Sequence, residues 1–308
     1  MILTYTAGQG DAGRKVYHIL RKDLDLSAAM VRRLKQTDAI CLDGQSVFTD
    51  RTVQPGQRLT VAVTLAEPPC DVVPQEGPVE ILYEDGGLLA LNKPAGMIVH
   101  PSHSRYTDTL ANYAAGYLLR TTGSGACHAV GRLDRDTGGV VLFAKNSYMK
   151  YRAAKAMAAG EKRYLALAAG GPEADRGVMD FPIRREREGD MRRIVAPDGQ
   201  RAVTRYAVLA RHRLSGQAVT LLELTLETGR THQIRVHCAH MGMPLLGDTL
   251  YQTEQSRALS ETLGVHGQAL HAGSLSITEP LSGTALTITA PIRRADFRAV
   301  LASMGVAT

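Results

Sequence analysis

The stretch of this sequence best suited to chemistry is a short charged loop that contains Asp134. Residues 131–139 read Gly-Arg-Leu-Asp-Arg-Asp-Thr-Gly-Gly, and the apolar residues 140–143 follow directly. Loops at strand edges are where rigid scaffolds usually carry reactive groups. The glycines do not form a Walker phosphate loop, because no Gly-Lys-Ser/Thr follows them. The alternative is a surface loop whose arginines and aspartates pair with one another, which contributes little energy.

A second candidate segment, residues 91–97, reads Leu-Asn-Lys-Pro-Ala-Gly-Met. The proline ends a predicted strand and the glycine permits a turn, so Asn92 and Lys93 fall at a strand end, where ligand contacts are common. Spacing alone favours a plain turn with a surface lysine.

The third segment, residues 162–166, reads Lys-Arg-Tyr-Leu-Ala. On a strand, Lys162 and Tyr164 point to the same face because side chains alternate. Tyr164 can stack on a base or bond a carboxylate, and a half-buried structural tyrosine is the equally common alternative.

The fourth segment, residues 227–237, joins a predicted strand to a predicted helix and reads Glu-Thr-Gly-Arg-Thr-His-Gln-Ile-Arg-Val-His. Arg230 falls just before the helix. His232, His237 and His240 invite a metal interpretation, but only the last two have a spacing that puts them on one helical face. No nearby carboxylate or cysteine completes a familiar set of ligands, so we expect no metal.

Composition limits the classes of protein to which the chain can belong. It has 308 residues, 44% of them apolar, a net charge of +6 and a pI near 9.2, which suits a globular protein with a polyanionic partner. We find no signal peptide and no apolar run of the roughly 18 residues that span a bilayer, and therefore expect a cytoplasmic protein. The single cysteines at 41, 70, 127 and 238 are expected to be buried, reduced thiols.

The first 66 residues are predicted to form a small α/β unit. Helical spacing covers residues 13–22 and 27–34, and Ser27 is placed to cap the second helix. A hairpin turning at Asp43-Gly44 and a strand over 58–63 follow. Four prolines in residues 67–78 then indicate a linker and a domain boundary.

Residues 79–308 mix strands and helices, and several strands follow one another without a helix. This order predicts an α+β fold with a mixed, largely antiparallel central sheet. The predicted strands are residues 80–83, 88–92, 140–144, 163–168, 203–210, 219–226, 274–277 and 284–288. The predicted helices are residues 108–119, 147–158, 231–240 and 294–304.

Taken in order, the four segments resemble the RluA-type pseudouridine synthases. That family has Asn-Lys-Pro-x-Gly, then His-Arg-Leu-Asp-x-x-Thr-Ser-Gly, Lys-x-Tyr-Leu-Ala and Gly-Arg-Thr-His-Gln-Ile-Arg-Val-His. The resemblance covers about residues 79–295 and implies the pseudouridine synthase fold. Glycines at 131 and 138 replace the usual histidine and serine, which raises the question of how firmly the loop is held.

Residues 13–63 resemble, more loosely, the small RNA-binding domain named for ribosomal protein S4. Gln57 stands where a Gly-Asp pair is usual. The basic helix of that domain is represented here by Arg32, Arg33 and Lys35. The resemblance implies an RNA-binding domain over residues 1–66 and a catalytic domain over residues 79–308.

The resemblance also implies roles at the site. Asp134 is the catalytic carboxylate, with Asp136 as a local rival. Arg230 pairs with Asp134, and Tyr164 lies against the target base and takes part in the final proton removal. The implied substrate-binding residues are Arg132, Asn92, Lys93, His232, Gln233 and Arg235. Arg132 occupies the space left by the flipped base or contacts the phosphates, and Lys93 and Arg235 hold the RNA backbone.

The function expected from the resemblance is isomerisation of uridine to pseudouridine in structured RNA, ribosomal or transfer. The reaction exchanges no electrons overall, so we expect no cofactor, and we expect a monomer. Two alternatives remain: an RNA-binding protein that keeps the fold without catalysis, and a sugar-processing hydrolase with Asp136 as its second carboxylate.

Overall fold

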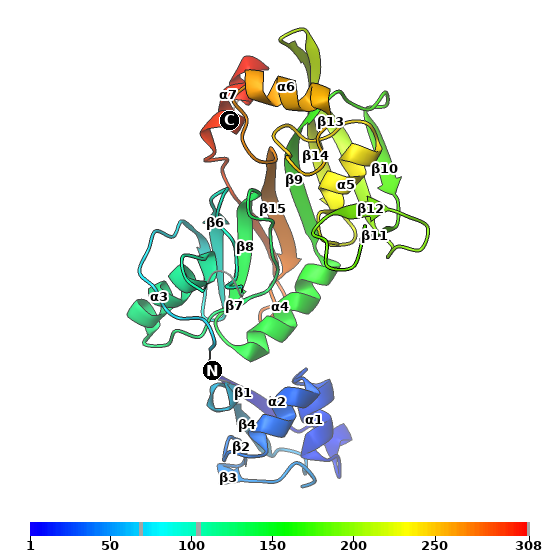
Figure 1. Cartoon of the computed structure of the whole chain (residues 1–308). Helices are drawn as coiled ribbons and strands as arrows, with labels where there is room; N and C mark the ends of the chain where they lie inside the picture. The colour runs from blue at the N-terminus through cyan, green and yellow to red at the C-terminus, as the bar shows by residue number, and fades with distance from the viewer. Residues whose placement is uncertain (68–69, 103–105, 307–308) are drawn as a thin grey trace.

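The computed structural model describes residues 1–67, 70–102 and 106–306 (Figure 1). Residues 2–66 fold around a four-stranded sheet in the order β1-β4-β2-β3. Ser27 caps α2 by accepting a hydrogen bond from the Met30 amide, as predicted. Asp43 and Gly44 both have positive φ, as a two-residue hairpin turn requires. The elements are β1 (Ile2–Thr6), α1 (Val16–Lys22), α2 (Ala28–Leu34), β2 (Ile40–Leu42), β3 (Gln45–Ser46) and β4 (Arg58–Ala62), with short 3-10 turns at Gln9–Asp11 and Val63–Ala66.

The proline-rich segment that follows is held against the larger part of the chain. Gln75 donates its amide to the Asn112 carbonyl at 3.0 Å, and the Asn112 side chain donates to Val73 at 2.8 Å. Pro68 and Pro69 lie outside the described residues. The described part of the predicted linker is thus an irregular segment that is hydrogen-bonded to helix α3 (Leu110–Thr122).

Most of the remaining chain is organised by a ten-stranded sheet (Figure 1). Its order is β10-β13-β14-β9-β15-β8-β6-β5, with β16 beside β15 and β7 beside β8. Of the strand pairs described, only β8 with β15 is parallel, so the predicted mixed, largely antiparallel sheet is confirmed. The strands are β5 (Ile81–Glu84), β6 (Leu88–Lys93), β7 (His128–Ala129), β8 (Gly138–Ala144), β9 (Glu161–Ala169), β10 (Arg176–Asp180), β13 (Val203–Leu214), β14 (Gln217–Leu226), β15 (Leu270–Thr278) and β16 (Ala285–Thr289).

Helices cover both faces of this sheet, and β6 and β8 are buried at every residue. Along β6, Leu89 and Leu91 face α3, whereas Leu88 and Ala90 face α4 (Ser147–Ala159). Farther along the sheet, α5 (Gln233–His240) packs on one face, while α6 (Glu254–Thr262) and α7 (Ala295–Ser303) pack on the other. None of the described helices combines the length and apolar composition needed to cross a bilayer.

Helix α4 also connects the two parts of the chain. The Tyr148 hydroxyl donates to the carbonyl of Leu24 at 3.2 Å, and Lys155 forms an ion pair with Asp25 at 2.8 Å. The buried Tyr148 side chain therefore belongs to a core that continues into residues 2–66.

Several elements were not predicted, and each lacks an apolar period. The face of α6 that is buried consists of Ser256, Leu259 and Ser260, so serines replace the expected apolar stripe. The hairpin of β11 (Ile183–Arg185) and β12 (Arg193–Val195) is short and rich in arginine. Strand β1 is half exposed, and β10 is a sheet-edge strand.

Candidate functional site

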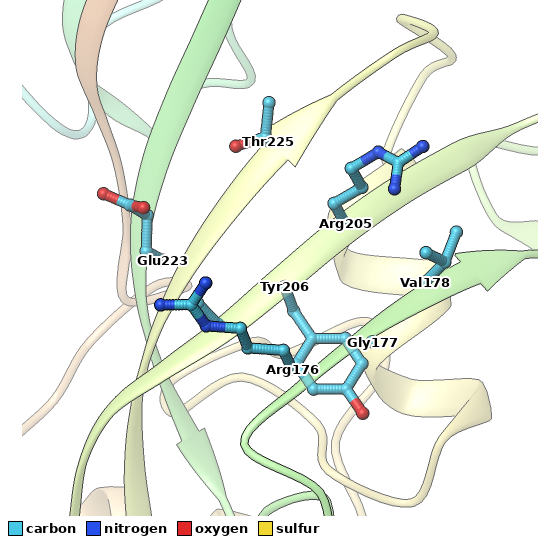
Figure 2. Close-up of a pocket in the computed structure, with 8 residues that line it drawn as sticks. Arg176, Gly177, Val178, Arg205, Tyr206, Glu223 and Thr225 are labelled. Carbon is cyan, nitrogen blue, oxygen red and sulfur yellow. The ribbon is translucent and has the colours of Figure 1, made fainter.

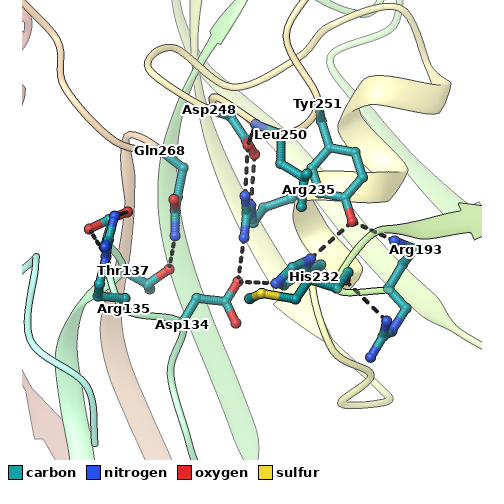
Figure 3. Close-up of polar contacts among 12 residues, drawn as sticks. Asp134, Arg135, Thr137, Arg193, His232, Arg235, Asp248, Leu250, Tyr251 and Gln268 are labelled. Carbon is teal, nitrogen blue, oxygen red and sulfur yellow. Dashed lines mark hydrogen bonds and ion pairs between the residues drawn. The ribbon is translucent and has the colours of Figure 1, made fainter. Parts of the chain in front are cut away.

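Asp134 lies in the loop between β7 and β8, and backbone contacts hold this loop in place. The carbonyl of Arg135 accepts hydrogen bonds from the Lys93 ammonium at 2.7 Å and from the Gly96 amide at 2.9 Å. Gln268 donates to the Thr137 hydroxyl at 3.2 Å (Figure 3). The loop is thus anchored at two points in spite of the glycines at 131 and 138.

The glycine that the loop requires is Gly139. Its φ is +111°, and a Cβ there would lie 2.2 Å from the Ala272 carbonyl oxygen, because β8 and β15 approach closely. A Cβ at Gly131 would meet the flexible end of Met157 at 3.1 Å, and one at Gly138 would meet His271 at 3.3 Å. A side chain at either of these two positions would fit if the neighbouring atoms moved by a few tenths of an ångström.

Asp134 forms an ion pair with Arg235, which in turn is fixed by Asp248 (Figure 3). Arg235 Nη1 lies 3.1 Å from Asp134 Oδ2, and its Nε and Nη2 each lie 2.7 Å from an Asp248 oxygen. The Asp248 side chain is fully buried, Arg235 is 8% exposed and Asp134 is 27% exposed. Burial disfavours the charged form of Arg235, but Asp248 and Asp134 outweigh it and raise its pKa.

This geometry corrects the predicted partner of Asp134. Arg230 lies before α5, and its side chain donates to the carbonyl of Arg201 at 3.1 Å. Arg235 is inside the helix, where its side chain is buried against Asp248. Of the two arginines in the fourth segment, the structure brings Arg235 to Asp134 and leaves Arg230 exposed at another carbonyl.

His232 is the second residue beside Asp134. Its Nε2 lies 3.8 Å from Asp134 Oδ2, and its Nδ1 lies 2.9 Å from the hydroxyl of Tyr251 (Figure 3). Burial lowers the pKa of His232, so its ring is neutral near pH 7. The site therefore contains Tyr251, which ends residues 244–251, a segment that agrees with the family pattern but to which the resemblance assigns no role.

Tyr164 lies on β9 in the cluster that packs against α5. Burial raises the pKa of Tyr164 to about 12, and the nearby Asp134 carboxylate adds to this effect. Tyr164 is thus a protonated phenol at neutral pH, close enough to Asp134 to respond to its charge.

Three predicted substrate contacts are buried parts of the scaffold. The Lys93 ammonium donates to the carbonyls of Pro94, Met97 and Arg135 at 2.6–2.9 Å and is 1% exposed. Asn92 donates to Glu80 and to the Pro291 carbonyl. Gln233 donates to the Val203 carbonyl and the Thr204 hydroxyl. None of the three is free to hold RNA, and Arg235 is likewise committed to two carboxylates.

The predicted cationic contacts differ in exposure. Arg132, Arg32 and Lys35 are exposed, and no ion pair to Arg132 occurs among the described residues. Arg33 instead links α2 to α4 by donating to the Ser147 hydroxyl at 3.0 Å.

The remaining histidines of the fourth segment have structural contacts. The ring nitrogens of His237 lie 3.0 Å from the Thr204 hydroxyl and 3.0 Å from the Phe181 carbonyl, and His240 packs on the Phe181 ring. Among the described residues, no three His, Cys, Asp or Glu side chains are grouped to hold a metal. Cys127 and Cys238 are buried as expected, whereas Cys41 and Cys70 are partly exposed.

A well-formed concavity lies elsewhere, between β10, β13 and β14 (Figure 2). It measures about 410 Å³, and Arg176, Arg205 and Glu223 line it. Tyr164 pairs with Leu224, whose side chain faces α5, so the neighbouring Glu223 points to the opposite face of the sheet. We refer to this opposite face, with its arginines, as the back face; it contains none of the residues around Asp134.

Comparison with known proteins gives a consistent result. Residues 87–240 match the RNA pseudouridylate synthase family. The RNA pseudouridine synthase YhcT of Bacillus subtilis is 34% identical over 286 residues, which cover 91% of this chain and 90% of YhcT. The ribosomal large subunit pseudouridine synthase D of Xanthomonas campestris is 36% identical over 271 residues, covering 84% and 79%. The structure of human RNA pseudouridylate synthase domain containing 4 has a TM-score of 0.60 and 25% identity, covering 74% of this chain and 94% of that protein.

Proposed function

Because the chain belongs to the RNA pseudouridine synthase family and is therefore an isomerase acting on RNA, we propose that Asp134 is its catalytic carboxylate. The observation that carries this proposal is that only one of the two carboxylate oxygens of Asp134 is hydrogen-bonded to a described residue. Oδ2 accepts from Arg235, whereas Oδ1 has no hydrogen bond among the described residues and the side chain is 27% exposed. A carboxylate fixed through one oxygen presents the other to a substrate.

The chemistry explains why a carboxylate is needed. Pseudouridine forms when the bond between uracil N1 and the ribose breaks, the uracil rotates, and the ring rejoins through C5; C5 then loses its proton and N1 gains one. A carboxylate can stabilise the ribose as the base departs, as a covalent nucleophile does in retaining glycosidases. Arg235 fixes the direction of the carboxylate by a charge-assisted hydrogen bond.

Tyr164 is proposed to hold the uracil rather than to remove a proton. A phenol with a pKa of about 12 stays protonated at neutral pH, so it has little of the base form that could remove a proton. It can still pack against the base and donate a hydrogen bond.

We propose that the substrate is large-subunit ribosomal RNA. The support is the 36% identity to a ribosomal large subunit pseudouridine synthase over 84% of this chain. A target uridine must leave its stack to reach Asp134, which costs a few kcal/mol. The exposed Arg132, two residues before Asp134 in the same loop, can contact phosphates or fill the vacated space. This target implies action in the cytoplasm, and we propose that the enzyme acts there as a monomer.

Residues 1–66 are proposed to be an RNA-binding domain. Arg32 and Lys35 are exposed on and just after α2, where phosphates can reach them. Arg33 has a different role, because its contact with Ser147 ties the domain to α4.

The test compares two aspartates in the same loop. Asp134→Asn should lose at least about a thousandfold in turnover, because the nucleophile is replaced by an amide of the same shape. Asp136→Asn is the matched control, since Asp136 pairs with the exposed Arg135. Pseudouridine is mapped in ribosomal and transfer RNA after incubation with each variant. Turnover by Asp134→Asn near the wild-type rate would refute the assignment, and modification of transfer RNA alone would refute the proposed substrate.

A further inference from the structure

Tyr251 contacts both residues that flank Asp134, although it does not contact Asp134 itself. Its hydroxyl lies 2.9 Å from His232 Nδ1, and the Arg235 guanidinium lies 5.2 Å from the centre of its ring (Figure 3). A guanidinium over an aromatic face is attracted by the electrons of the ring. One buried side chain thus supports two neighbours of the carboxylate.

The hydroxyl of Tyr251 has a second partner that limits what it can do. The backbone amide of Arg193, at the start of β12, donates to this oxygen at 2.8 Å. The phenol has a single proton of its own to donate, and Nδ1 of His232 is the nearby acceptor.

The opposite arrangement of protons is unfavourable. If His232 carried its proton on Nδ1, the phenol proton would have no acceptor among the described residues. The lone pair on Nε2 would then face the Asp134 carboxylate. With the proton on Nε2, Nδ1 can accept the phenol proton, and the N–H faces the Asp134 carboxylate across 3.8 Å, where the attraction is electrostatic rather than a hydrogen bond.

We propose that Tyr251 is a positioning residue, which fixes His232 as the neutral Nε2–H tautomer with its proton directed at Asp134. The proposal rests on the catalytic role of Asp134. His232 and Arg235 then act from two directions on Oδ2 and leave Oδ1 to the substrate. The backbone of His232 is constrained as well, with φ of +59°. The position from which its side chain extends is therefore fixed.

The tautomer is measured directly by ¹⁵N NMR of the histidine rings in the full-length protein. His232 is assigned by the resonances lost in His232→Gln. We expect the proton on Nε2 in the wild type, and its partial or complete transfer to Nδ1 in Tyr251→Phe. A wild-type ring protonated on Nδ1 or on both nitrogens, or no change in Tyr251→Phe, would overturn the proposal.

Kinetics supply the second measurement. Tyr251→Phe keeps the ring under Arg235 and should slow single turnover about tenfold, as for the loss of one oriented hydrogen bond, with RNA affinity unchanged within about twofold. Glutamine at 232 carries an amide N–H without a tautomer, so Tyr251→Phe should add little in the His232→Gln background. An equal loss in both backgrounds would indicate a merely structural role.

Two controls separate the possible failures. Tyr117→Phe removes a hydroxyl that binds Glu84 at 2.7 Å, away from the site, and should leave turnover unchanged. The NMR result needs no turnover. An active Asp134→Asn would therefore refute the proposed function, whereas an inactive Asp134→Asn with the wrong tautomer at His232 would refute only the role of Tyr251.

Discussion

The two faces of the large sheet carry similar charged residues in different surroundings. On the face with α5, Arg235 and Asp248 are 8% and 0% exposed and hold Asp134. On the back face, Arg205 pairs with Glu227 at 2.5 Å, but the two are 59% and 33% exposed (Figure 2 shows Arg205). Distance alone does not distinguish the two clusters.

Solvent distinguishes them. Exposed ion pairs contribute about 0–1 kcal/mol, because water screens the charges and holding the side chains costs entropy. A buried pair is not necessarily stabilising as a whole, yet removing one partner leaves a charge without solvent or counter-ion. Water therefore screens the ion pair on the back face, whereas the buried network constrains Asp134.

The largest expected effect comes from breaking the buried pair. Asp248→Asn leaves Arg235 without its bidentate partner and should lower the free energy of unfolding by about 3–5 kcal/mol. Single turnover should fall as well, since Arg235 loses its orientation. Urea unfolding and turnover measure the two effects. Glu227→Gln is the matched control and should cost less than about 1 kcal/mol; equal losses would contradict the comparison.

Lys93 provides a pH-dependent test of the same buried region. Burial lowers the pKa of Lys93 to about 7, with Asp136 and Asp134 opposing the shift. The ammonium has three N–H groups for three carbonyls, so deprotonation removes one donor from the loop. Turnover should therefore fall as pH rises through about 7.

Stability should change in the opposite direction at this residue. The ordinary lysine pKa is about 10.4, so the unfolded chain binds more protons between pH 7 and that value. The free energy of unfolding should therefore rise with pH over this range. Lys93→Met should be slow at every pH and lose both trends. A wild-type rate that is flat above pH 7 would refute the role of the ammonium.

The smallest effects concern exposed cations and RNA. Arg132→Gln and Arg32→Gln should each reduce the slope of log affinity against log salt by about 1, if each contacts one phosphate. Arg205→Gln on the back face should leave that slope unchanged. The slope is obtained from RNA binding at several salt concentrations, and a loss on Arg205→Gln equal to that on Arg132→Gln would make the back face an RNA contact.

The sequence predicted the main elements because most have clear local signals. The strand before Asn92 and the helix after Asn146 agree with β6 and α4 within a few residues. The partner of Asp134 could not be predicted in this way. Arg230 and Arg235 occur in the same segment, and which of them meets a loop 101 residues away depends on where α5 begins and how it packs.

Burial caused the other misplacements at the site. Lys93 resembles a surface lysine in sequence, but β6 is covered on both faces, so its last residue is buried too. The role of Tyr251 could not be predicted, although its segment agrees with the family pattern, because that role comes from contacts with His232 and Arg193, which are distant in sequence.

The parallel pairing of β8 with β15 has a consequence for synthesis of the chain. Gly138 pairs with His271, and Gln268 anchors Thr137, so the loop that carries Asp134 is completed by residues made more than a hundred positions later. A nascent chain lacking β15 already contains Lys93, Arg235 and Asp248, but it cannot pair Gly138 with His271. If ribosomal RNA is the substrate, an enzyme still attached to the ribosome is surrounded by that RNA before this pairing can form. The order of translation thus completes the support of the loop only when nearly the whole sheet can form.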